Sequence, residues 1–511
     1  MSTSGMLLPD WLRRSAANHP NRLALRCGPV TWSFAELDRQ ATRFARKLAT
    51  AGAREGVRVA LLAQNGVDYV VAVHALTRLG AVLVPLNTRL TLDEHCWQLA
   101  DVRASLLLCD AVYAARAAEI GQRMRELPLV TLASESSEGM QTLSVLSEDE
   151  RPLRDERDEI DLSATQAILY TSGTTGQPKG AIITYGMQWW NAAASALNLG
   201  HDPQDRWLAC LPLYHIGGLS ILFRSVIYGI GVVVLERFDA AAVNEAIAAE
   251  RVTIISVVTV MLQRMLAALD EAGVGKRYPA ALRCVLLGGG PAPRPLLEDC
   301  AQRHIPVVQT YGLTESCSQA ATLAPDDALR KLGSAGKPLT PVQLRIVHEG
   351  ESAAPGNVGE IELRGPTITP GYADRPDATA AAFRDGWLAT GDIGYLDADG
   401  YLYVLDRRVD LIISGGENVY PAEIEATLLA HPDVEEVGVC GMPDAQWGQA
   451  PVAFVRLRGG RQITPDDLLI YAAERLARYK VPRGIYIVAV LPRTSSGKLL
   501  RRELPSLLPD A

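Results

Sequence analysis

Apolar and polar positions near the start of the chain alternate between a helical and a strand-like spacing. Residues 33–52 carry apolar side chains at helical spacing, and the pattern ends at Gly52. Residues 57–63 and 81–87 are short apolar runs of strand length, separated by a helical stretch at 67–80. A strand, a helix and a second strand at this spacing predict a parallel sheet with helices covering its faces.

The same alternation returns at residues 207–260 and 283–310. Two apolar runs there, residues 284–290 and 305–312, are typical of strands that open into glycine-rich or polar turns. In open α/β sheets, ligands gather at the carboxyl ends of the strands. These two turns are therefore predicted to border a binding site.

The longest apolar stretch, around residues 217–236, lacks the pattern of a membrane span. Arg224 lies in its middle, and Gly229 and Gly231 precede a run of β-branched residues. A membrane-spanning helix needs about 20 predominantly apolar residues without such interruptions. A buried helix followed by a buried strand is the interpretation that fits.

The last third of the chain has a different pattern. From about residue 355, short strands alternate with frequent turns, which predicts a small β-rich subdomain. Residues 407–511 combine strand and helix signals over a length sufficient for an α+β domain. The predicted fold class is therefore α/β. A large N-terminal domain, 1–406, has parallel and mixed sheets flanked by helices plus the β-rich subdomain, and a small α+β domain follows at 407–511.

Composition narrows the class of protein. Of the 511 residues, 48% are hydrophobic and 21% charged, as in globular proteins, and the net charge of −8 argues against a general binder of nucleic-acid backbones. The eight cysteines show no CxxC spacing, which favours buried reduced thiols in a reducing compartment over disulfides or a zinc site. The first residues lack a basic region followed by an apolar one, so no signal peptide is expected and the predicted location is cytoplasmic.

The strongest chemical signal is the segment YTSGTTGQPKG at residues 170–180, which follows the apolar run AIL. Its glycines permit close backbone approach, and its hydroxyls and lysine can surround an anion, a combination suited to a polyphosphate. The spacing of a Walker A loop is not met. A flexible surface loop rich in Ser, Thr and Gly is the alternative.

This segment resembles the signature of the adenylate-forming superfamily, which includes acyl- and aryl-CoA synthetases, luciferase-like enzymes and the adenylation domains of peptide synthetases. The other segments of that family follow in order: LPLYHIGGL, LLGGGPAP, QTYGLTES, GWLATGDIGYLDADGYLYVLDR, SGGENVYPAEIE and PRTSSGKLLRREL. They extend over nearly the whole chain. The resemblance implies an acid–thiol ligase that uses ATP, Mg²⁺ and CoA. It would form an acyl-adenylate with release of pyrophosphate, and then the CoA thioester with release of AMP.

The resemblance also implies a nucleotide site. Tyr311 is expected to stack on the adenine, Thr314 to reach the α-phosphate and Glu315 to help place Mg²⁺. Asp392 and Arg407 are expected to hold the ribose hydroxyls, since a carboxylate is a good acceptor for a diol. The implied ATP- and AMP-binding residues are Thr171, Ser172, Gly173, Thr174, Thr175, Gly176, Lys179, Gly288, Gly289, Gly290, Thr310, Tyr311, Gly312, Asp392 and Arg407.

The same resemblance implies residues that act at the acyl group. Lys498 is expected to bridge the attacking carboxylate and the α-phosphate, because two anions meet there and catalysis needs positive charge. His215 is expected to border the acyl site and to move between the half-reactions, with a packed histidine as the alternative. It is not assigned as a general base, since a carboxylic acid is already ionised near neutral pH. The implied catalytic residues are Lys498, Thr314, Glu315 and His215.

In the family, the C-terminal domain rotates between the two half-reactions, so residues 407–511 are expected to be mobile. The rotation is implied to withdraw Lys498 and to bring a loop to the thiol channel. That loop contains Ser414, Gly415, Gly416 and Glu417. The hinge is expected in the segment DRRVD, where many relatives have Asp or Lys and this chain has either Val409 or Asp410 at the pivot.

Longer stretches within residues 184–339 resemble one branch of the superfamily, the 2-succinylbenzoate–CoA ligases of menaquinone biosynthesis; they include HIGGLSILFRSVIYG and LRKLGSAGKPL. The substrate of that branch keeps one charged carboxylate while the other is activated, and a buried carboxylate needs donors that a fatty-acyl pocket lacks. The expected acyl pocket contains His215, Ser220, Arg224, Thr259 and Gly289. A structural salt bridge or a helix-surface charge for Arg224, and capping or backbone-bonding hydroxyls for Ser220 and Thr259, are the alternatives.

Other functions are compatible with these signatures. A general aryl- or medium-chain fatty acid–CoA ligase would have the same mechanism, and an adenylating enzyme can load a separate carrier protein. A non-catalytic relative that binds nucleotide or acyl ligands is an alternative of another class, against which the retained Lys498 and Glu315 argue. The expected partners are a small carboxylic acid, ATP and CoA, without nucleic acid or a membrane span. The family also suggests a homodimer.

Overall fold

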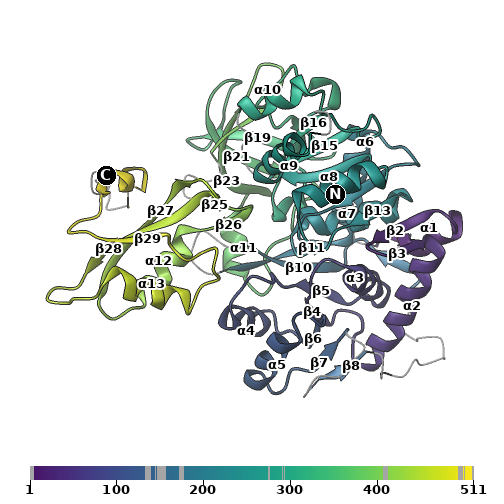
Figure 1. Cartoon of the computed structure of the whole chain (residues 1–511), viewed down its shortest axis with the longest axis horizontal. Coiled ribbons are helices and arrows are strands. Elements are labelled where there is room, and N and C mark those ends of the chain that lie inside the picture. Colours follow the sequence, from purple (N-terminus) through teal and green to yellow (C-terminus); the bar gives the residue numbers. More distant parts are fainter. Residues whose placement is uncertain are drawn as a thin grey trace. The chain divides into compact units, whose positions relative to one another are not determined.

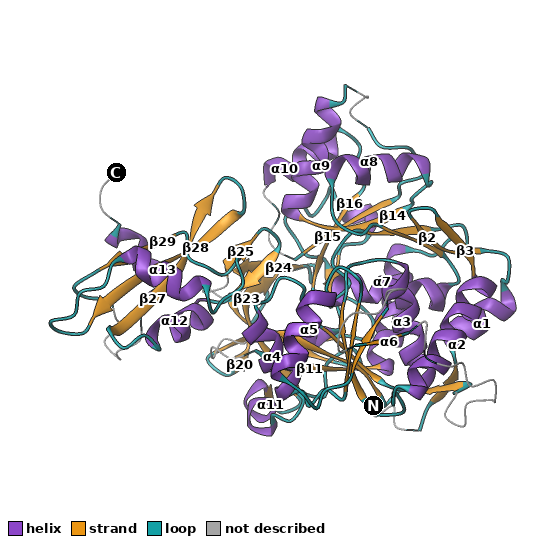
Figure 2. Ribbon diagram, turned by 60° about the horizontal axis from the view of Figure 1, so that its bottom comes forward, coloured by secondary structure: helices purple, strands orange, loops and turns teal. Residues whose placement is uncertain are grey.

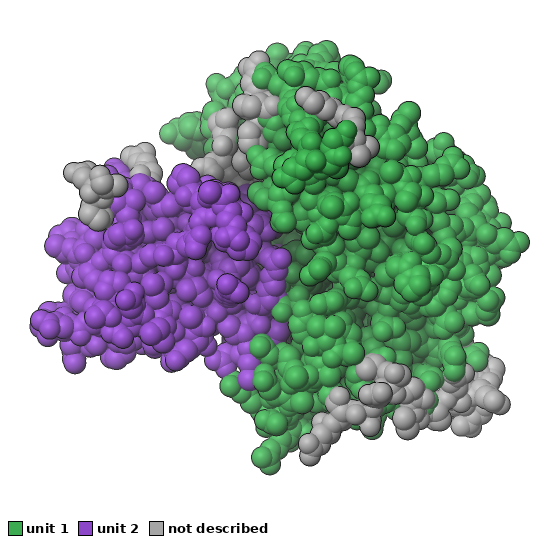
Figure 3. Space-filling model, viewed as in Figure 1, with its two compact units in different colours: residues 1–88, 99–169, 180–405 green, residues 89–98, 170–179, 406–511 purple. Residues whose placement is uncertain are grey.

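The computed structural model describes residues 5–132, 140–143, 146, 157–171, 178–273, 277–289, 292, 294–406, 412–492, 499 and 501–508. The chain forms two compact units (Figure 3). Unit 1 comprises Met1–Thr88, Leu99–Leu169 and Gly180–Leu405, and unit 2 comprises Arg89–Gln98, Tyr170–Lys179 and Asp406–Ala511. The division into domains 1–406 and 407–511 stays a prediction.

A seven-stranded sheet contains the strand–helix–strand pattern predicted near the start of the chain. β4 (Arg58–Leu62) lies between β5 (Val82–Pro85) and β6 (Leu106–Cys109) and is parallel to both. Helix α3 (Val67–Leu79) connects β4 to β5 and ends at Gly80, whose φ of +62° suits a glycine at a helix C-terminus. The predicted parallel sheet is therefore confirmed. The other strands of this sheet are β7 (Leu129–Thr131), β8 (Gln141–Thr142), β10 (Thr165–Thr171) and β11 (Lys179–Thr184).

The nine-stranded sheet of unit 1 has the order β18-β17-β16-β15-β14-β12-β13-β2-β3, and its strands β16, β15, β13, β2 and β3 are labelled in the right-hand part of Figure 1. Neighbouring strands from β16 to β2 run parallel. The strands are β2 (Leu23–Cys27), β3 (Val30–Ser33), β12 (Arg206–Ala209), β13 (Gly231–Val234), β14 (Ile254–Val258), β15 (Cys284–Gly288), β16 (Val307–Tyr311), β17 (Ala321–Thr322) and β18 (Lys337–Pro338). The predicted buried helix and strand at 217–236 are confirmed as α7 (Ile216–Tyr228) and β13.

Successive residues of these strands face two different hydrophobic cores. On β12, Trp207 and Ala209 belong to one core together with residues of α7, whereas Leu208 belongs to the other. The second core includes residues of α8, α9 and α10, which lie on one side of β14–β16 in Figure 2. Helices cover both faces, as the alternation of side chains in a parallel sheet requires. The remaining helices of unit 1 are α1 (Trp11–Asn18), α2 (Phe34–Thr50), α5 (Ala114–Arg123), α6 (Tyr185–Leu199), α8 (Ala240–Ala249), α9 (Thr259–Glu271), α10 (Arg294–Gln302) and α11 (Pro376–Ala382).

The β-rich subdomain is confirmed, but it begins earlier in the chain than predicted. β19 (Gln343–His348) pairs antiparallel with β21 (Gly359–Arg364), which pairs with β23 (Trp387–Leu396). Ile346 is the one fully buried side chain of β19, so the apolar pattern of this strand is too weak to recognise. The sheet also contains β20 (Glu351–Ser352), β22 (Phe383–Arg384) and β24 (Leu402–Asp406), and a separate pair joins β1 (Leu7–Pro9) to β9 (Glu159–Asp161).

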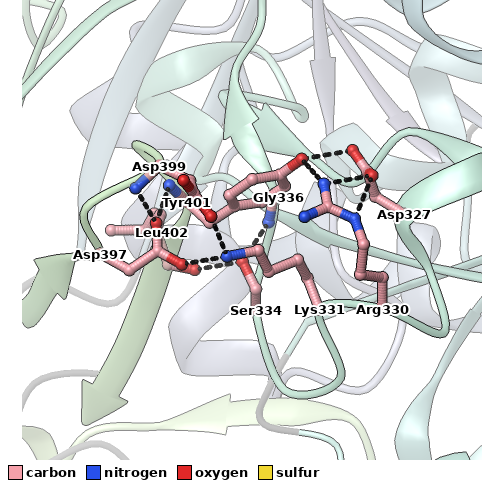
Figure 4. Close-up of polar contacts among 9 residues, drawn as sticks. All are labelled: Asp327, Arg330, Lys331, Ser334, Gly336, Asp397, Asp399, Tyr401 and Leu402. Atoms are coloured by element: carbon pink, nitrogen blue, oxygen red, sulfur yellow. Dashed lines mark hydrogen bonds and ion pairs between the residues drawn. The ribbon is translucent and has the colours of Figure 1, made fainter.

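The turn between β23 and β24 is held to the segment that follows β17 (Figure 4). Lys331 Nζ lies 2.7 Å from carboxylate oxygens of both Asp397 and Asp399. The Tyr401 hydroxyl donates to Asp327, in the short 3₁₀ helix η2 (Pro325–Asp327), at 2.5 Å. Lys331 Nζ also lies 4.5 Å from the centroid of the Tyr401 ring. We refer to Asp327, Arg330, Lys331, Asp397, Asp399 and Tyr401 as the surface clasp.

Unit 2 contains a five-stranded sheet in the order β26-β25-β28-β27, with β29 paired to β28. Helices α12 (Pro421–Leu429) and α13 (Pro465–Ala473) bury Ile424, Leu428 and Leu468 in the core of this sheet. The predicted α+β class of the C-terminal region is confirmed. The strands of this region are β25 (Ile412–Ser414), β26 (Glu417–Val419), β27 (Val434–Asp444), β28 (Gly448–Leu457) and β29 (Gly484–Ile487), and it also contains the 3₁₀ helix η3 (Arg501–Leu507). Helix α4 (Leu92–Asp101) comes much earlier in the chain, and its residues up to Gln98 belong to unit 2.

Seven of the eight cysteines are buried, as predicted. Burial raises the pKa of Cys109 to about 11 and that of Cys317 to about 12, so both thiols stay protonated and weakly reactive near neutral pH. Among the described residues, no helix is both long enough and apolar enough to cross a membrane.

Candidate active site

Four chain segments meet at the carboxyl edge of the nine-stranded sheet. β16, β15, β14 and β12 are parallel neighbours, so their carboxyl ends lie at one edge. His215 follows β12, Thr259 follows β14, Gly289 follows β15 and Gly312 follows β16. The two turns predicted from position alone to border a site are therefore neighbours at this edge.

Two of the turns have no room for a side chain. A Cβ on Gly312 would lie 1.5 Å from the Ser318 carbonyl oxygen. Gly289 has a φ of +81°, and a Cβ there would lie 2.8 Å from Cγ1 of Val258. Close packing explains glycine at both positions.

Tyr311 and Asp392 form a buried pair at this edge. The Tyr311 hydroxyl donates to Oδ2 of Asp392 at 2.7 Å, and the two residues are 4% and 3% exposed. The Asp392 backbone N–H donates to the Thr390 hydroxyl at 3.1 Å, which helps to fix the carboxylate on β23. Thr310, beside Tyr311, lies 2.8 Å from the Thr322 hydroxyl. The structure thus brings together Tyr311, expected at the adenine, and Asp392, expected at the ribose.

Glu315 lies in the short 3₁₀ helix η1 (Thr314–Ser316), which follows β16. Its Oε1 accepts a hydrogen bond from the Tyr372 hydroxyl at 3.0 Å, and its carbonyl accepts from the Thr369 backbone N–H at 2.8 Å. A carboxylate held in this way fits Mg²⁺, which is commonly bound by one or two protein carboxylates together with substrate phosphates. No cluster of three or more metal-ligating side chains occurs among the residues that the structure describes.

His215 occupies the position before the first residue of α7. Its ring lies 4.7 Å from the Tyr214 ring at an interplanar angle of 61°, and the side chain is half-buried. The edge-to-face contact holds the imidazole at the start of the helix. This position is compatible with the expected border of the acyl site.

Arg224, on α7, is 1% exposed. Its Nη2 donates to Oδ1 of Asn191, on α6, at 2.6 Å, and its guanidinium lies 5.3 Å from the centroid of the Trp207 ring. Burial lowers the pKa of Arg224, against the influence of Tyr228 and Cys317. In the described ranges no carboxylate pairs with this guanidinium, so the alternative of a structural salt bridge finds no support there. The alternative of a charge on the helix surface does not agree with the burial of Arg224.

Further polar atoms near Arg224 are buried and have no hydrogen-bond partner among the residues that the structure describes. They are Oγ of Ser220, Nε2 of Gln319 and Nε of Arg224 itself. Ser220 lies one turn before Arg224 on α7 and is 0% exposed. Thr259, half-buried, is the first residue of α9. Buried donors without partners are uncommon in native proteins and require an explanation.

The predicted thiol-channel loop belongs to unit 2 and forms the turn between β25 and β26. Gly415 and Gly416 have φ values of +57° and +84°, and a Cβ on Gly415 would lie 2.5 Å from the Trp447 ring. Ser414 is buried, and Glu417 pairs with Arg89 of the same unit at 3.3 Å. In the same unit, the Thr171 hydroxyl donates to the Lys179 carbonyl at 3.5 Å.

Several predicted residues lie outside the described ranges. They are Ser172, Gly173, Thr174, Thr175, Gly176, Gly290, Arg407 and Lys498, together with the candidate pivots Val409 and Asp410. Their roles stay predictions.

Three polar residues of this region were missed in the sequence. Asn191 orients Arg224, Gln319 contributes a buried amide and Tyr372 holds Glu315. A polar residue among apolar ones is the signal that could have found Asn191, since α6 is mostly apolar. No such signal marks Gln319 or Tyr372, because both lie in irregular segments.

Comparison with known families defines the class of protein. The family of AMP-binding enzymes matches residues 12–373, and the C-terminal domain of AMP-binding enzymes matches residues 423–498. The chain therefore belongs to the AMP-binding enzyme family, and the predicted membership of the adenylate-forming superfamily is confirmed.

Individual relatives are similar over nearly the whole chain. A 2-succinylbenzoate–CoA ligase of Geobacillus kaustophilus is 52% identical over 502 residues, which is 98% of each protein. A double mutant of o-succinylbenzoate CoA synthetase from Bacillus subtilis, solved with the product analogue OSB-NCoA, is 43% identical with a TM-score of 0.89, covering 98% of this chain and 99% of that one. The Bacillus subtilis enzyme in complex with ATP and magnesium gives a TM-score of 0.72 at 43% identity, covering 98% of this chain and 100% of that one.

Proposed function

We propose that the protein is an AMP-forming 2-succinylbenzoate–CoA ligase. In the first half-reaction, an oxygen of the succinyl carboxylate attacks the α-phosphorus of ATP, and the bond from that phosphorus to the bridging oxygen breaks. Pyrophosphate leaves and the acyl-adenylate remains. In the second, the sulfur of CoA attacks the acyl carbon as the thiol gives up its proton, the bond to AMP breaks, and the thioester forms.

The observation that carries the choice of acid is the buried guanidinium of Arg224, which has no carboxylate counter-ion among the described residues. An arginine is always charged near neutral pH, and an uncompensated buried charge is unfavourable. The ring carboxylate of 2-succinylbenzoate would supply the missing negative charge. A fatty acid or benzoate, whose one carboxylate is consumed by activation, would not. The full-length similarity to 2-succinylbenzoate–CoA ligases supports the same conclusion.

The nucleotide-binding role rests on the pair formed by Tyr311 and Asp392 and on Glu315. The Asp392 carboxylate, fixed by one hydrogen bond from Tyr311, can accept others from the ribose diol. Glu315 and the substrate phosphates would hold Mg²⁺, whose charge offsets the negative charge of the phosphates. Thr314 would donate to the α-phosphate from its place beside Glu315.

The remaining roles come from the family pattern of the sequence. Lys498 would place a positive charge between the two anions of the first half-reaction, where electrostatic stabilisation of the transition state is strongest. The glycine turn of Ser414–Glu417 would admit the thiol in the second half-reaction because it has little side-chain bulk. Residues 407–511 would move as one domain between these steps. We also propose a cytoplasmic location, supported by the buried thiols, and a homodimer, which the elution volume in size-exclusion chromatography would test.

The test is an assay of acid preference. The protein is incubated with ATP, Mg²⁺ and CoA, and 2-succinylbenzoate is compared with benzoate and medium-chain fatty acids by AMP release and by the mass of the CoA thioester. A strong preference for 2-succinylbenzoate that Lys498→Ala abolishes is the expected result. Preference for another acid would replace the substrate and keep the ligase mechanism. Absence of AMP release would contradict ligase activity with free CoA, and ATP–pyrophosphate exchange would then separate carrier loading from ligand binding alone.

A further inference from the structure

Asn191 holds Arg224 in place from a neighbouring helix. Its Oδ1 accepts from Nη2 of Arg224 at 2.6 Å, while its Nδ2 donates to the carbonyl of Gln319 at 2.8 Å. The second amide contact orients the side chain, because only one end of an asparagine amide is an acceptor. The chain segment that it contacts comes directly after Glu315, so one side chain links α6, α7 and the segment that leaves the nucleotide site.

The surroundings of this contact contain donors without matching acceptors. Within the part of the chain that the structure describes, Arg224 Nε, Ser220 Oγ and Gln319 Nε2 are all buried with no hydrogen-bond partner. Asn191, Ser220, Arg224 and Gln319 are each no more than 1% exposed. Burying donors without acceptors is unfavourable, and an anion that brings acceptors to these donors would remove this cost.

The residue type at position 191 decides how Arg224 is held. An aspartate could reach the same guanidinium nitrogen, but it would also neutralise the charge permanently. An asparagine supplies the acceptor and leaves the positive charge uncompensated. The two side chains have nearly the same volume, and they differ by one charge and by the Nδ2 donor, which in Asn191 binds the Gln319 carbonyl.

We propose that Asn191 is a specificity-determining positioning residue, which orients Arg224 without neutralising it and so reserves the guanidinium charge for a second carboxylate on the acyl substrate. This inference rests on the proposed function, since it assumes that Arg224 faces the acyl substrate. Asn191, a neutral side chain, would thereby favour dicarboxylic over monocarboxylic acids as substrates.

The experiment compares two substrates that differ in one group. They are 2-succinylbenzoate and 4-oxo-4-phenylbutanoate, which lacks the ring carboxylate, and the readout is the ratio of their kcat/KM values for thioester formation by the full-length enzyme with ATP, Mg²⁺ and CoA. Asn191→Asp is expected to lower kcat/KM for the dicarboxylic acid by about 30-fold or more, the range for losing a buried charged partner. The monocarboxylic acid is expected to be used as well as before or better, because the introduced carboxylate then compensates Arg224 without help from the substrate.

Asn198→Asp is the matched control. Asn198 lies on the same helix, and its Nδ2 likewise donates to a backbone carbonyl, that of Leu323, at 2.9 Å. Among the described residues no arginine contacts Asn198, so the variant is expected to keep the wild-type substrate ratio. Asn191→Ala provides a second variant in case Asn191→Asp fails to fold. It removes the acceptor that holds Arg224, and the ratio of kcat/KM for the dicarboxylic acid to that for the monocarboxylic acid should fall by about fivefold, as for one hydrogen bond.

The outcomes separate the inference from the proposed function. A wild-type enzyme that does not prefer 2-succinylbenzoate overturns both. A wild-type enzyme with that preference, whose position-191 variants lose activity equally on both substrates or keep the ratio unchanged, overturns the inference alone and leaves Asn191 a structural residue. Opposite responses to the two substrates support it, since general loss of structure would lower both.

Discussion

The nucleotide side of unit 1 contains Tyr311, Asp392 and Glu315, and the acyl side contains Ser220, Arg224 and Gln319. The two sides differ in whether their buried polar groups have hydrogen-bond partners. On the nucleotide side, the Tyr311 hydroxyl and the Asp392 carboxylate satisfy each other at 2.7 Å, and Tyr372 holds Glu315. On the acyl side, Arg224 Nε, Ser220 Oγ and Gln319 Nε2 are buried without hydrogen-bond partners in the described ranges.

This difference reflects what each side must recognise. ATP is common to the whole family, so its site can be built from groups that are already paired and rigid. The acid is particular to one branch, and donors left unpaired in the protein can discriminate strongly between a ligand that supplies acceptors and one that does not. Selectivity is therefore expected to respond to changes in α6 and α7, and nucleotide affinity to changes in β16 and β23.

The largest effect is expected from Arg224→Met. Removal of the guanidinium should lower kcat/KM for 2-succinylbenzoate by about 100-fold or more, because the ring carboxylate is then buried without a partner. The value for 4-oxo-4-phenylbutanoate should change by less than about threefold. Thioester mass measures both. Arg264→Met is the control, since Arg264 is an exposed arginine over the Phe238 ring, and equal losses on both acids would abolish the distinction between the two sides.

A smaller effect, on the KM for ATP and not on the preference among acids, is expected from Asp392→Ala. Loss of the charged acceptor should raise the KM for ATP by about 30-fold, within the range for hydrogen bonds to charged groups. The preference among acids should not change, because Asp392 lies on the nucleotide side. Initial rates at varied ATP test this with each acid. Asp399→Ala, on the turn after the same strand, should leave the KM unchanged; a shift in acid preference in Asp392→Ala would contradict the separation.

Tyr372→Phe should have a moderate effect confined to the metal requirement. The hydroxyl holds one carboxylate oxygen of Glu315 at 3.0 Å. Its loss should raise the Mg²⁺ concentration for half-maximal ATP–pyrophosphate exchange by about fivefold, the value of one hydrogen bond. An unchanged Mg²⁺ titration would show that Glu315 does not depend on Tyr372.

The smallest effect is expected at the surface clasp, where Lys331→Met should lower the unfolding temperature by about 2 °C. The preference among acids and the affinity for the nucleotide should not change. The pKa of Asp397 lies below its ordinary value. Burial of the carboxyl group would raise this pKa, but hydrogen bonds from Lys331 and from the backbone lower it. A lowered carboxyl pKa stabilises the fold above the ordinary pKa, and this contribution disappears as pH falls through the lowered value. The difference between wild type and variant should therefore be present at neutral pH and vanish in acid, as measured by thermal unfolding; a difference that grows in acid would contradict this sign.

Much of the fold was predictable because its signals are local. The capping box formed by Ser33 and Glu36 and the apolar spacing that follows mark α2. Strands β12 to β15 of the nine-stranded sheet are short, mostly apolar runs, since both of their faces are buried. β19 escaped recognition because Ile346 alone is fully buried in it.

The candidate site was predictable in part for the same reason. Gly312, Tyr311 and Glu315 lie within one recognisable segment after a strand, and Arg224 interrupts an apolar helix. Asn191 and Tyr372 were missed, since their contacts depend on residues 33 and 57 positions away. Asn191 interrupts a mostly apolar helix, but this local signal does not identify its partner, and Tyr372 lacks even such a signal.

The sequence by itself determined the fold class, the family and the chemistry, because periodicity and short motifs are properties of neighbouring residues. Only the tertiary structure decided that Asn191, Arg224 and the carbonyl of Gln319, which are far apart in the chain, form one buried cluster. It also decided that Arg224 has a neutral partner there. Whether a buried charge is compensated depends on everything packed around it, and that packing is set by long-range contacts between α6, α7 and the segment after β16.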